Sequence, residues 1–283
     1  MNTVYKISFA FILFIMGLQA HAGGGWPQPK NSGYFKLGQY GIIADNYFTP
    51  AGDIVDITTT GYYSTYLYGE YGLTDRLTAV VYFPFFSRST LNQLEDSEGN
   101  LIQEGESVNS LGDTDISLKY NLINKSVAVS VALTLGLPIG NASGGTSGLL
   151  QTGDGEFNQM LSVEAGKSLG SEGKYYVSGM LGFNNRTEGF SDEFRYSLEG
   201  GAHFGKWWSI LRMYGIKSLK NSSESFQPNN GIFSNDIEYV SVSPEVVYEA
   251  KENWGVSMGA GFAFNAKRVL AAPAFTAGIY LKI

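Results

Sequence analysis

The sequence predicts an all-β protein, a transmembrane up-and-down antiparallel β-barrel of about 12 strands. Three observations predict this fold. Apolar residues alternate with small or polar ones, the alternating segments are about ten to thirteen residues long, and long connections alternate with short ones. A tilted strand needs about 9–11 residues to cross a bilayer, whereas strands of globular proteins average about 5–6. A soluble sandwich also alternates, but its connections have no reason to keep this order.

The alternation is clearest between Val127 and Leu137, where valine and leucine occupy the odd positions. Alanine, serine, threonine and glycine occupy the even positions between them. The stretches 254–264 and 275–283 repeat the pattern near the C-terminal end. Successive side chains of a strand point to opposite faces, so one face is expected to meet lipid and the other to line a lumen.

Twelve candidate strands follow from this pattern. They lie near residues 33–44, 57–71, 76–87, 113–122, 127–138, 156–168, 174–184, 193–204, 207–218, 236–248, 254–265 and 272–283. The longer connections are 45–56, 88–112, 139–155, 185–192, 219–235 and 266–271, and the shorter ones are 72–75, 123–126, 169–173, 205–206 and 249–253. Outer-membrane barrels place long loops outside and short turns in the periplasm. An even strand number leaves both ends of the barrel on the periplasmic side.

The first 22 residues are typical of a cleaved signal peptide. Lys6 precedes an apolar run from Ile7 to Leu18, and the small residues Ala20 and Ala22 form a cleavage pattern. The run is too short for a membrane-spanning helix, which needs about 20 residues. We therefore expect export, a mature chain that starts at Gly23, and a location in the outer membrane of a Gram-negative-type cell.

The composition agrees with a barrel wall and limits the partners. The chain has 18 tyrosines, 18 phenylalanines and 36 glycines, and only 16% of its residues are charged. Aromatic residues near strand ends are expected to anchor the wall at the membrane interfaces. The net charge of −7 argues against nucleic acid as a partner, and the lack of cysteine excludes disulfides and thiolate chemistry. The expected partners are outer-membrane lipids and, during insertion, the barrel-assembly machinery.

Three stretches resemble a known family of outer-membrane proteins. They are YGEYGLTDR at 68–76, LGDTDISLKY at 111–120 and LTLGLPIG at 133–140. The sequence is similar here to the family associated with the meta-pathway of phenol degradation. That resemblance implies a channel or transporter for hydrophobic, often aromatic, compounds, and it implies no catalytic residues. Physically, Gly72 and Asp75 suit a tight turn, and Pro138 suits the end of a strand.

The domain organisation that follows is a signal peptide (1–22), an N-terminal periplasmic segment or plug (23–32) and the barrel (33–283). The inward faces of the predicted strands supply the candidate lumen residues. These candidates are Tyr62, Tyr66, Tyr68, Glu70, Asp115, Lys119, Glu164, Arg195, Glu199, His203, Arg212 and Glu245. Arg212 lies on a strand of ambiguous orientation, and we turn it inward because arginine is costly against lipid.

Two interpretations of this lumen stay open. The charges could form an internal network of ion pairs that fills the barrel and makes it a structural or surface-interaction protein. Alternatively, the tyrosines of 57–71 could face the small residues of 128–136 and 255–263 across a narrow path. Eight strands are filled by side chains and sixteen leave an aqueous channel, so twelve allow only a narrow pore. We favour passive uptake of small, mostly hydrophobic or aromatic compounds.

An enzyme is the third hypothesis and the weakest one. Hydrolases need a nucleophile with a base beside it. After removal of His21 the mature chain keeps one histidine, His203, and the sequence has no glycine-flanked serine elbow or metal-ligand spacing. The sequence therefore predicts no catalytic residues, no cofactor and no metal site.

Overall fold

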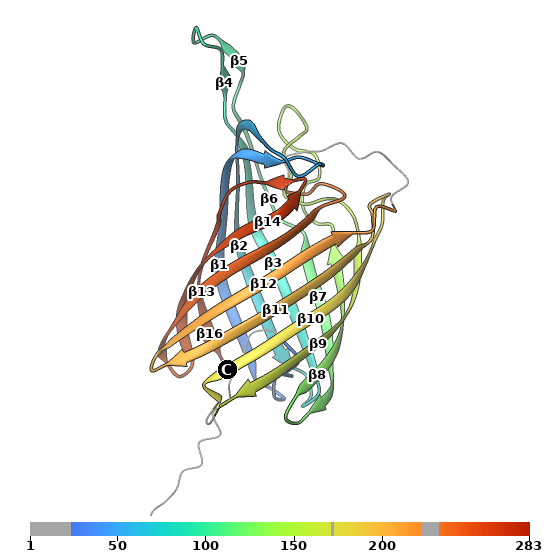
Figure 1. Ribbon diagram of the computed structural model, residues 1–283, viewed down its shortest axis with the longest axis vertical. Helices are drawn as coiled ribbons and strands as arrows, with labels where there is room; N and C mark the ends of the chain where they lie inside the picture. Colours follow the sequence, from blue (N-terminus) through green and yellow to red (C-terminus); the bar gives the residue numbers. More distant parts are fainter. Residues whose placement is uncertain (1–23, 171–172, 222–231) are drawn as a thin grey trace, which may run out of the picture.

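The computed structural model describes residues 24–170, 173–221 and 232–283, and over these residues twelve long strands close into one barrel (Figure 1). The predicted signal peptide lies outside the described residues. The barrel strands are β1 (Gly33–Phe48), β2 (Ile54–Gly72), β3 (Leu77–Leu91), β7 (Thr114–Asn124), β8 (Ala128–Leu137), β9 (Asn158–Leu169), β10 (Tyr175–Arg186), β11 (Glu193–Phe204), β12 (Trp207–Ser218), β13 (Glu238–Lys251), β14 (Trp254–Lys267) and β16 (Ala274–Lys282). The predicted fold class and strand number are confirmed.

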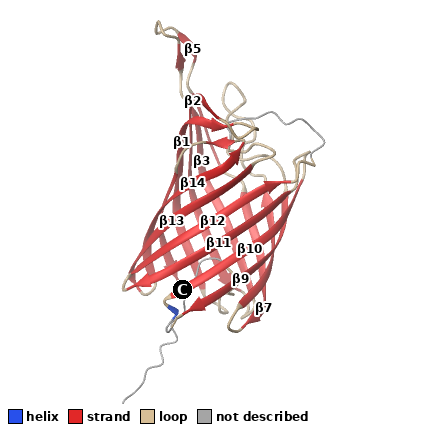
Figure 2. Ribbon diagram, viewed as in Figure 1, coloured by secondary structure: helices blue, strands red, loops and turns tan. Residues whose placement is uncertain are grey.

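Each strand pairs antiparallel with its neighbours in the sequence, and β1 closes the barrel. Leu37 of β1 lies opposite Leu67 of β2 on one side and opposite Ile279 of β16 on the other. Closure leaves no free edge, so the main-chain groups of the wall are satisfied between strands. Strands supply almost all of the regular structure (Figure 2). No helix among the described residues is long and apolar enough to cross a bilayer.

Short turns and long loops lie at opposite ends of the barrel, as predicted. A two-residue turn, Gly205–Lys206 between β11 and β12, has glycine at φ +65°, a conformation that residues with a Cβ adopt reluctantly. The C-terminal end of the chain lies at the end with the short turns, and the longest connections gather at the other end (Figure 1). By the usual orientation of such barrels, the turn end is periplasmic and the loop end is outside.

One loop contains more regular structure than the sequence predicted. The connection 88–112 carries three short strands, β4 (Leu94–Glu95), β5 (Leu101–Gln103) and β6 (Glu106–Ser110), while β15 (Val269–Leu270) extends the last loop. β3 continues to Leu91 because β6 pairs with its outer end. The β4–β5 hairpin projects beyond the barrel (Figure 1). Its turn is held by Asp96, whose carboxylate accepts the N–H groups of Glu98 and Asn100 at 2.9 and 2.8 Å.

The aromatic residues divide between the two faces of the wall by type. Phenylalanines are exposed on the lipid side, as Phe183, Phe262 and Phe275 show. Many tyrosines point inward instead, and Tyr34 and Tyr176 are almost fully buried. The expectation that aromatic residues near strand ends anchor the wall at the membrane interface is therefore wrong for Tyr34, at the start of β1. A hydroxyl-bearing ring can pack and also donate a hydrogen bond inside a polar lumen, which phenylalanine cannot do.

A charge on the lipid face should destabilise the barrel, and the same charge one residue further on should not. Leu133 is 48% exposed toward lipid, while the hydroxyl of Thr134 lies on the lumen side, 2.8 Å from Ser117 Oγ. We expect Leu133→Arg to lower the free energy of unfolding by about 2–4 kcal/mol. Urea titration in lipid vesicles measures this, with Thr134→Arg as the control at the same depth. Equal destabilisation by both variants would contradict the assigned faces.

Candidate functional site

The interior of the barrel holds two cavities, one above the other along its axis. The lower cavity has a volume of about 470 Å³ and lies toward the periplasmic turns. The upper cavity has a volume of about 460 Å³ and reaches the outer loops. Tyr40, Arg212, Glu245 and Thr276 line both of them. These four side chains therefore mark the level at which the lumen is divided.

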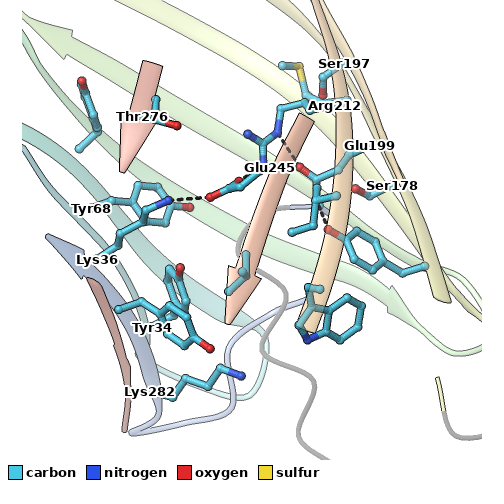
Figure 3. A pocket seen from close by; sticks show the side chains of 18 of the residues that line it. Tyr34, Lys36, Tyr68, Ser178, Ser197, Glu199, Arg212, Glu245, Thr276 and Lys282 are labelled. Atoms are coloured by element: carbon cyan, nitrogen blue, oxygen red, sulfur yellow. Dashed lines mark hydrogen bonds and ion pairs between the residues drawn. The ribbon is translucent and has the colours of Figure 1, made fainter. Parts of the chain in front are cut away.

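A belt of paired charges lies at this dividing level, formed by Lys36, Glu199, Arg212 and Glu245 (Figure 3). Lys36 Nζ is 2.9 Å from Glu245 Oε1, and Arg212 Nη2 is 2.5 Å from Glu199 Oε2. Arg212 also lies 3.9 Å from Glu245, which joins the two pairs across the lumen. The charged belt combines side chains of β1, β11, β12 and β13. Such charges are stable away from bulk water because each has a partner.

Aromatic rings form much of the wall of the lower cavity. Tyr34 stacks on Tyr280 with ring centroids 5.3 Å apart, and Tyr66 lies 5.1 Å from Tyr82. Tyr176 lies 5.7 Å from Trp208, and its hydroxyl donates a hydrogen bond of 2.6 Å to Glu199. The cavity thus offers ring faces and a few hydroxyl groups rather than free charge.

The floor of the lower cavity is a buried charge cluster under the N-terminal segment, residues 24–32. Lys119 Nζ lies 3.7 Å from both Glu70 and Glu164 and donates to the carbonyl of Gly24 at 3.2 Å. Glu70 is completely buried and accepts a further hydrogen bond from Gln28 Nε2 at 3.1 Å. The ammonium group therefore connects three strands, β2, β7 and β9, to the segment before the barrel.

The N-terminal segment makes further contacts inside the barrel. The carbonyl of Gly25 accepts hydrogen bonds from Asn121 Nδ2 at 3.0 Å and from Ser130 Oγ at 2.7 Å. The ring of Trp26 packs edge-on against Tyr176, with centroids 6.1 Å apart. Trp26 also occupies the space beside Gly166, where a Cβ would come within 2.5 Å of its ring. The small residues of β8 and β9 leave room for this segment.

The outer mouth is organised around Arg186 at the end of β10. Its guanidinium binds Asp154 at 2.8 Å, Glu156 at 2.6 Å and Glu193 at 2.8 Å, and lies 4.3 Å over the ring of Phe190. Asp154 and Glu156 belong to the loop between β8 and β9. One cation therefore ties this loop to the rim of β10 and β11. Among the described residues, no group of three or more His, Cys, Asp or Glu side chains is arranged to hold a metal ion.

Carboxylates meet at the same mouth. Asp113 accepts the main-chain N–H of Gly140 at 2.9 Å and that of Asp154 at 2.7 Å, which brings the two aspartates together. Burial raises the pKa of Asp113, and burial with the neighbouring Asp113 charge raises the pKa of Asp154 to about 7, although Arg186 opposes the shift. Asp154 therefore changes charge near neutral pH.

The upper cavity is apolar on the side opposite these charges. Ile42, Ile237, Leu270 and Phe233 line it, and Phe233 comes from the loop before β13. Phe233 packs against Tyr62 with ring centroids 5.6 Å apart. The cavity is thus amphipathic, with hydrocarbon on one wall and the arginines of β10 and β11 on the other.

The candidate residues from the sequence all lie on the inward face of their strands, in four places. Tyr66, Tyr68, Glu199, Arg212 and Glu245 line the lower cavity; Glu70, Lys119 and Glu164 form the floor cluster; Tyr62, Asp115 and Arg195 lie in the upper half; and His203 lies near a periplasmic turn. Asp115 lies beside Gly136, and Arg195 binds Glu193 at 2.6 Å. His203 lies 3.0 Å from Glu249 and stacks on Trp208.

Sequence reasoning missed Lys36, Arg186, Glu193 and Tyr176. The alternation of Phe35 and Leu37 with Lys36 could have placed Lys36 inside, because lysine between two lipid-facing residues must point to the lumen. Arg186 ends β10 and Glu193 begins β11, on either side of a loop. The alternation of side chains along a strand does not predict which residues a loop brings together.

Comparison with known proteins gives a family and a fold. The family described as "Putative MetA-pathway of phenol degradation" matches residues 16–278. The COG4313 outer membrane channel from Pseudomonas putida F1 is 14% identical with a TM-score of 0.64, and the alignment covers 94% of this chain and 100% of that one. The NanC porin is 7% identical with a TM-score of 0.53, covering 88% and 100%. At these identities the two structures show a shared barrel fold. No curated protein matches the sequence significantly.

Removing one carboxylate of the charged belt should change the ion preference of the lumen. Glu245→Gln leaves Lys36 and Arg212 facing Glu199 alone, so the belt becomes net positive. We expect the reversal potential in a salt gradient across a planar bilayer to move toward anion selectivity. Glu106→Gln, in an outer loop, is the matched control and should leave it unchanged. The same shift in both variants would show that the belt does not face the ion path.

The aspartate pair at the mouth should make stability depend on pH. Because the pKa of Asp154 is about 7 in the folded protein and about 3.9 in an unfolded chain, the folded state holds this proton more tightly. Stability should therefore fall as pH rises from about 4 to about 7. Asp154→Asn should show a smaller decrease in melting temperature between these values. Glu98→Gln, on the exposed hairpin, should behave like the unmodified protein, and an unchanged profile for Asp154→Asn would refute the assignment.

Proposed function

We propose, because the chain belongs to the outer-membrane family described as a MetA pathway of phenol degradation, that it is a channel for small, mostly hydrophobic or aromatic compounds. Passage is passive diffusion across the outer membrane. The fold shared with an outer-membrane channel and a porin supports the channel part of the proposal. The proposed substrate class is argued from the side chains that line the lumen of this chain.

The observation that carries the substrate class is the pairing of charges in an aromatic cavity. The three cations that line the lower cavity each have a carboxylate partner. Their pairs are Lys36 with Glu245 at 2.9 Å, Arg212 with Glu199 at 2.5 Å, and Lys282 with Glu249 at 3.1 Å. No cation of this wall is left to attract an anionic solute. What remains for a solute is ring surface, and aromatic faces favour flat apolar molecules.

The size of the cavities fits compounds of one or two rings. An apolar cavity of about 150 Å³ is enough to hold benzene, and each cavity here is about three times larger. Twelve strands enclose a narrower lumen than the sixteen of aqueous porins. Bulky sugars and peptides are therefore poor candidates.

The N-terminal segment is proposed to restrict the periplasmic exit. Its main chain is held by Lys119, Asn121 and Ser130, and its Trp26 ring lies beside the aromatic wall of the lower cavity. Further along, Gln28 binds Glu70 and Thr78, and the main chain of residues 31–32 pairs with Gly72 of β2, so the segment is fixed across this end of the barrel. A segment in this position would reduce the flow of ions through the lumen while the outer mouth stays accessible.

Deleting residues 23–32 should raise the single-channel conductance severalfold, because the lower cavity then opens to the periplasmic side. Planar bilayer recording of the purified protein and of the deletion variant measures this. Asn121→Ala with Ser130→Ala, which removes two ties to Gly25, should give an intermediate result. If the deletion leaves the conductance of the protein unchanged, the segment is not the restriction.

Uptake of an aromatic solute tests the substrate class directly. Intact cells that produce the protein should take up radiolabelled naphthalene faster than cells that do not, while naphthalene sulfonate should show a much smaller difference. Equal uptake of naphthalene with and without the protein, together with electrical silence of the deletion variant, would favour a structural barrel. The buried ion pairs at the floor and at the mouth would then serve rigidity alone.

A further inference from the structure

The upper cavity lies against an unusual part of the barrel wall, the segment Gly259–Ala263 of β14. All five residues of this segment line the cavity, and none has a side chain larger than alanine except Phe262. A Cβ added to Gly261 would have a single atom within 4 Å, Ser243 Oγ at 3.2 Å. The cavity therefore reaches the main chain of the wall itself.

The ladder between β13 and β14 is interrupted at this segment. Pairing runs to Val242 opposite Phe262, skips Ser243 and Pro244, and resumes with Glu245 opposite Gly259. The register is the same on both sides of the gap, so no bulge explains it. Pro244 has no N–H, and the Ala260 carbonyl that this register places opposite cannot accept a hydrogen bond from it.

The other edge of the same segment keeps its pairing as far as β16 extends. β14 pairs with β16 from Trp254 opposite Leu281 to Gly261 opposite Ala274, where β16 begins. Ala260 and Gly261 therefore keep partners on β16 but have none on β13, beside the upper cavity.

A second proline inside the wall shows a gap that is filled by protein. Pro84 of β3 lies between the pairing of β3 with β7 and that of β3 with β6. There Pro84 is buried, its carbonyl accepts the N–H of Gly112 at 2.8 Å, and a Cβ on Gly112 would lie 2.7 Å from Pro84 Cγ. That gap is filled by protein, whereas the gap at Pro244 adjoins a cavity of about 460 Å³.

The outer side of the interrupted segment faces lipid. Pro244 is exposed there, and Phe262 and Phe275 on either side are 41% and 62% exposed. An apolar solute in the upper cavity is thus separated from the hydrocarbon by one layer of backbone, whose residues Ala260 and Gly261 have no partner on β13. Separating strands at a fully paired seam would leave several donors and acceptors unsatisfied in lipid, which is costly. At this seam one of those bonds, the one that residue 244 would donate, is already absent.

From these observations we infer that the segment Gly259–Ala263 is a lateral portal, through which apolar solutes pass from the upper cavity into the hydrocarbon of the outer membrane. The inference rests on the proposed function, because it needs solutes that enter the lumen from outside. It adds a second route: solutes that leave sideways do so above the charged belt and need not pass the belt or the N-terminal segment. Ions and polar solutes keep the axial route.

A disulfide staple across the seam tests the portal. The chain has no cysteine, so Ser243→Cys with Gly261→Cys introduces a single pair, and the short distance at these positions suits a disulfide. The matched control is Ser162→Cys with Gly182→Cys, across the fully paired seam of β9 and β10, where a Cβ on Gly182 would lie 3.3 Å from Ser162 Cβ. Both staples replace one serine and one glycine on the lumen face.

The probe is 1-N-phenylnaphthylamine, which fluoresces when it enters membrane hydrocarbon, added to intact cells that produce each protein. The oxidised staple at 243 and 261 should lower the rate of fluorescence increase severalfold, and dithiothreitol should restore it. The control staple should have no effect. Planar bilayer conductance should be the same for the oxidised and reduced forms of each, which shows that the axial lumen is unchanged.

A second variant avoids the disulfide. Pro244→Thr returns an N–H donor to the middle of β13 and should also slow entry of the dye. The lateral portal would be overturned if cells with the oxidised staple and cells with Pro244→Thr both took up the dye as fast as cells with the unmodified protein. The proposed function would remain intact, provided that dye entry depends on the protein. If the unmodified protein does not accelerate dye entry at all, the proposed function fails, and the portal with it.

Discussion

The structure depends on one constraint, which is that a main-chain N–H or C=O group facing hydrocarbon has no water to bind. Only a ladder that closes on itself satisfies this requirement for strands. β1 provides the closure by pairing with β2 and β16 along most of its length. Prolines inside the wall are therefore informative. Pro84 is compensated by packing and by the N–H of Gly112, while Pro244 leaves Ala260 and Gly261 of β14 without a partner on β13.

Closure with alternation divides the side chains into two environments, and each environment selects its own chemistry. Lipid accepts phenylalanine, leucine and valine. The lumen accepts charges, but burial away from bulk water makes an unpaired charge costly, so carboxylates and cations meet in clusters of three or four. This pairing occurs at three levels of the barrel, where a cation binds carboxylates: Arg212 in the belt, Lys119 at the floor and Arg186 at the mouth. Tyrosine fills the remaining surface because its ring packs and its hydroxyl donates.

The strands and their faces could be predicted from the sequence because both follow from local alternation. Arg212 could be turned inward by the cost of arginine against lipid, without any knowledge of its partners. Its partners were not predictable. Lys36 and Glu245 are 209 residues apart in the sequence and meet only because the closing register sets β1 near β13 across β16 and β14. The cluster around Arg186 depends on the loop between β8 and β9, and the path of a loop cannot be predicted from alternation along the strands.

The division of the lumen and the weak seam have a common physical consequence. At the charged belt, an apolar solute would have to replace or pass groups that are bound to each other, and it offers them no hydrogen bonds in return. Above the belt, the same solute meets Ile42, Leu270 and the nearly bare backbone of Gly259–Ala263. For an ion the preference is reversed, because the seam leads to hydrocarbon, whereas the belt is a polar part of the axial lumen. One barrel can therefore separate solutes by polarity with no moving domain, since the two directions out of the upper cavity differ in what they offer.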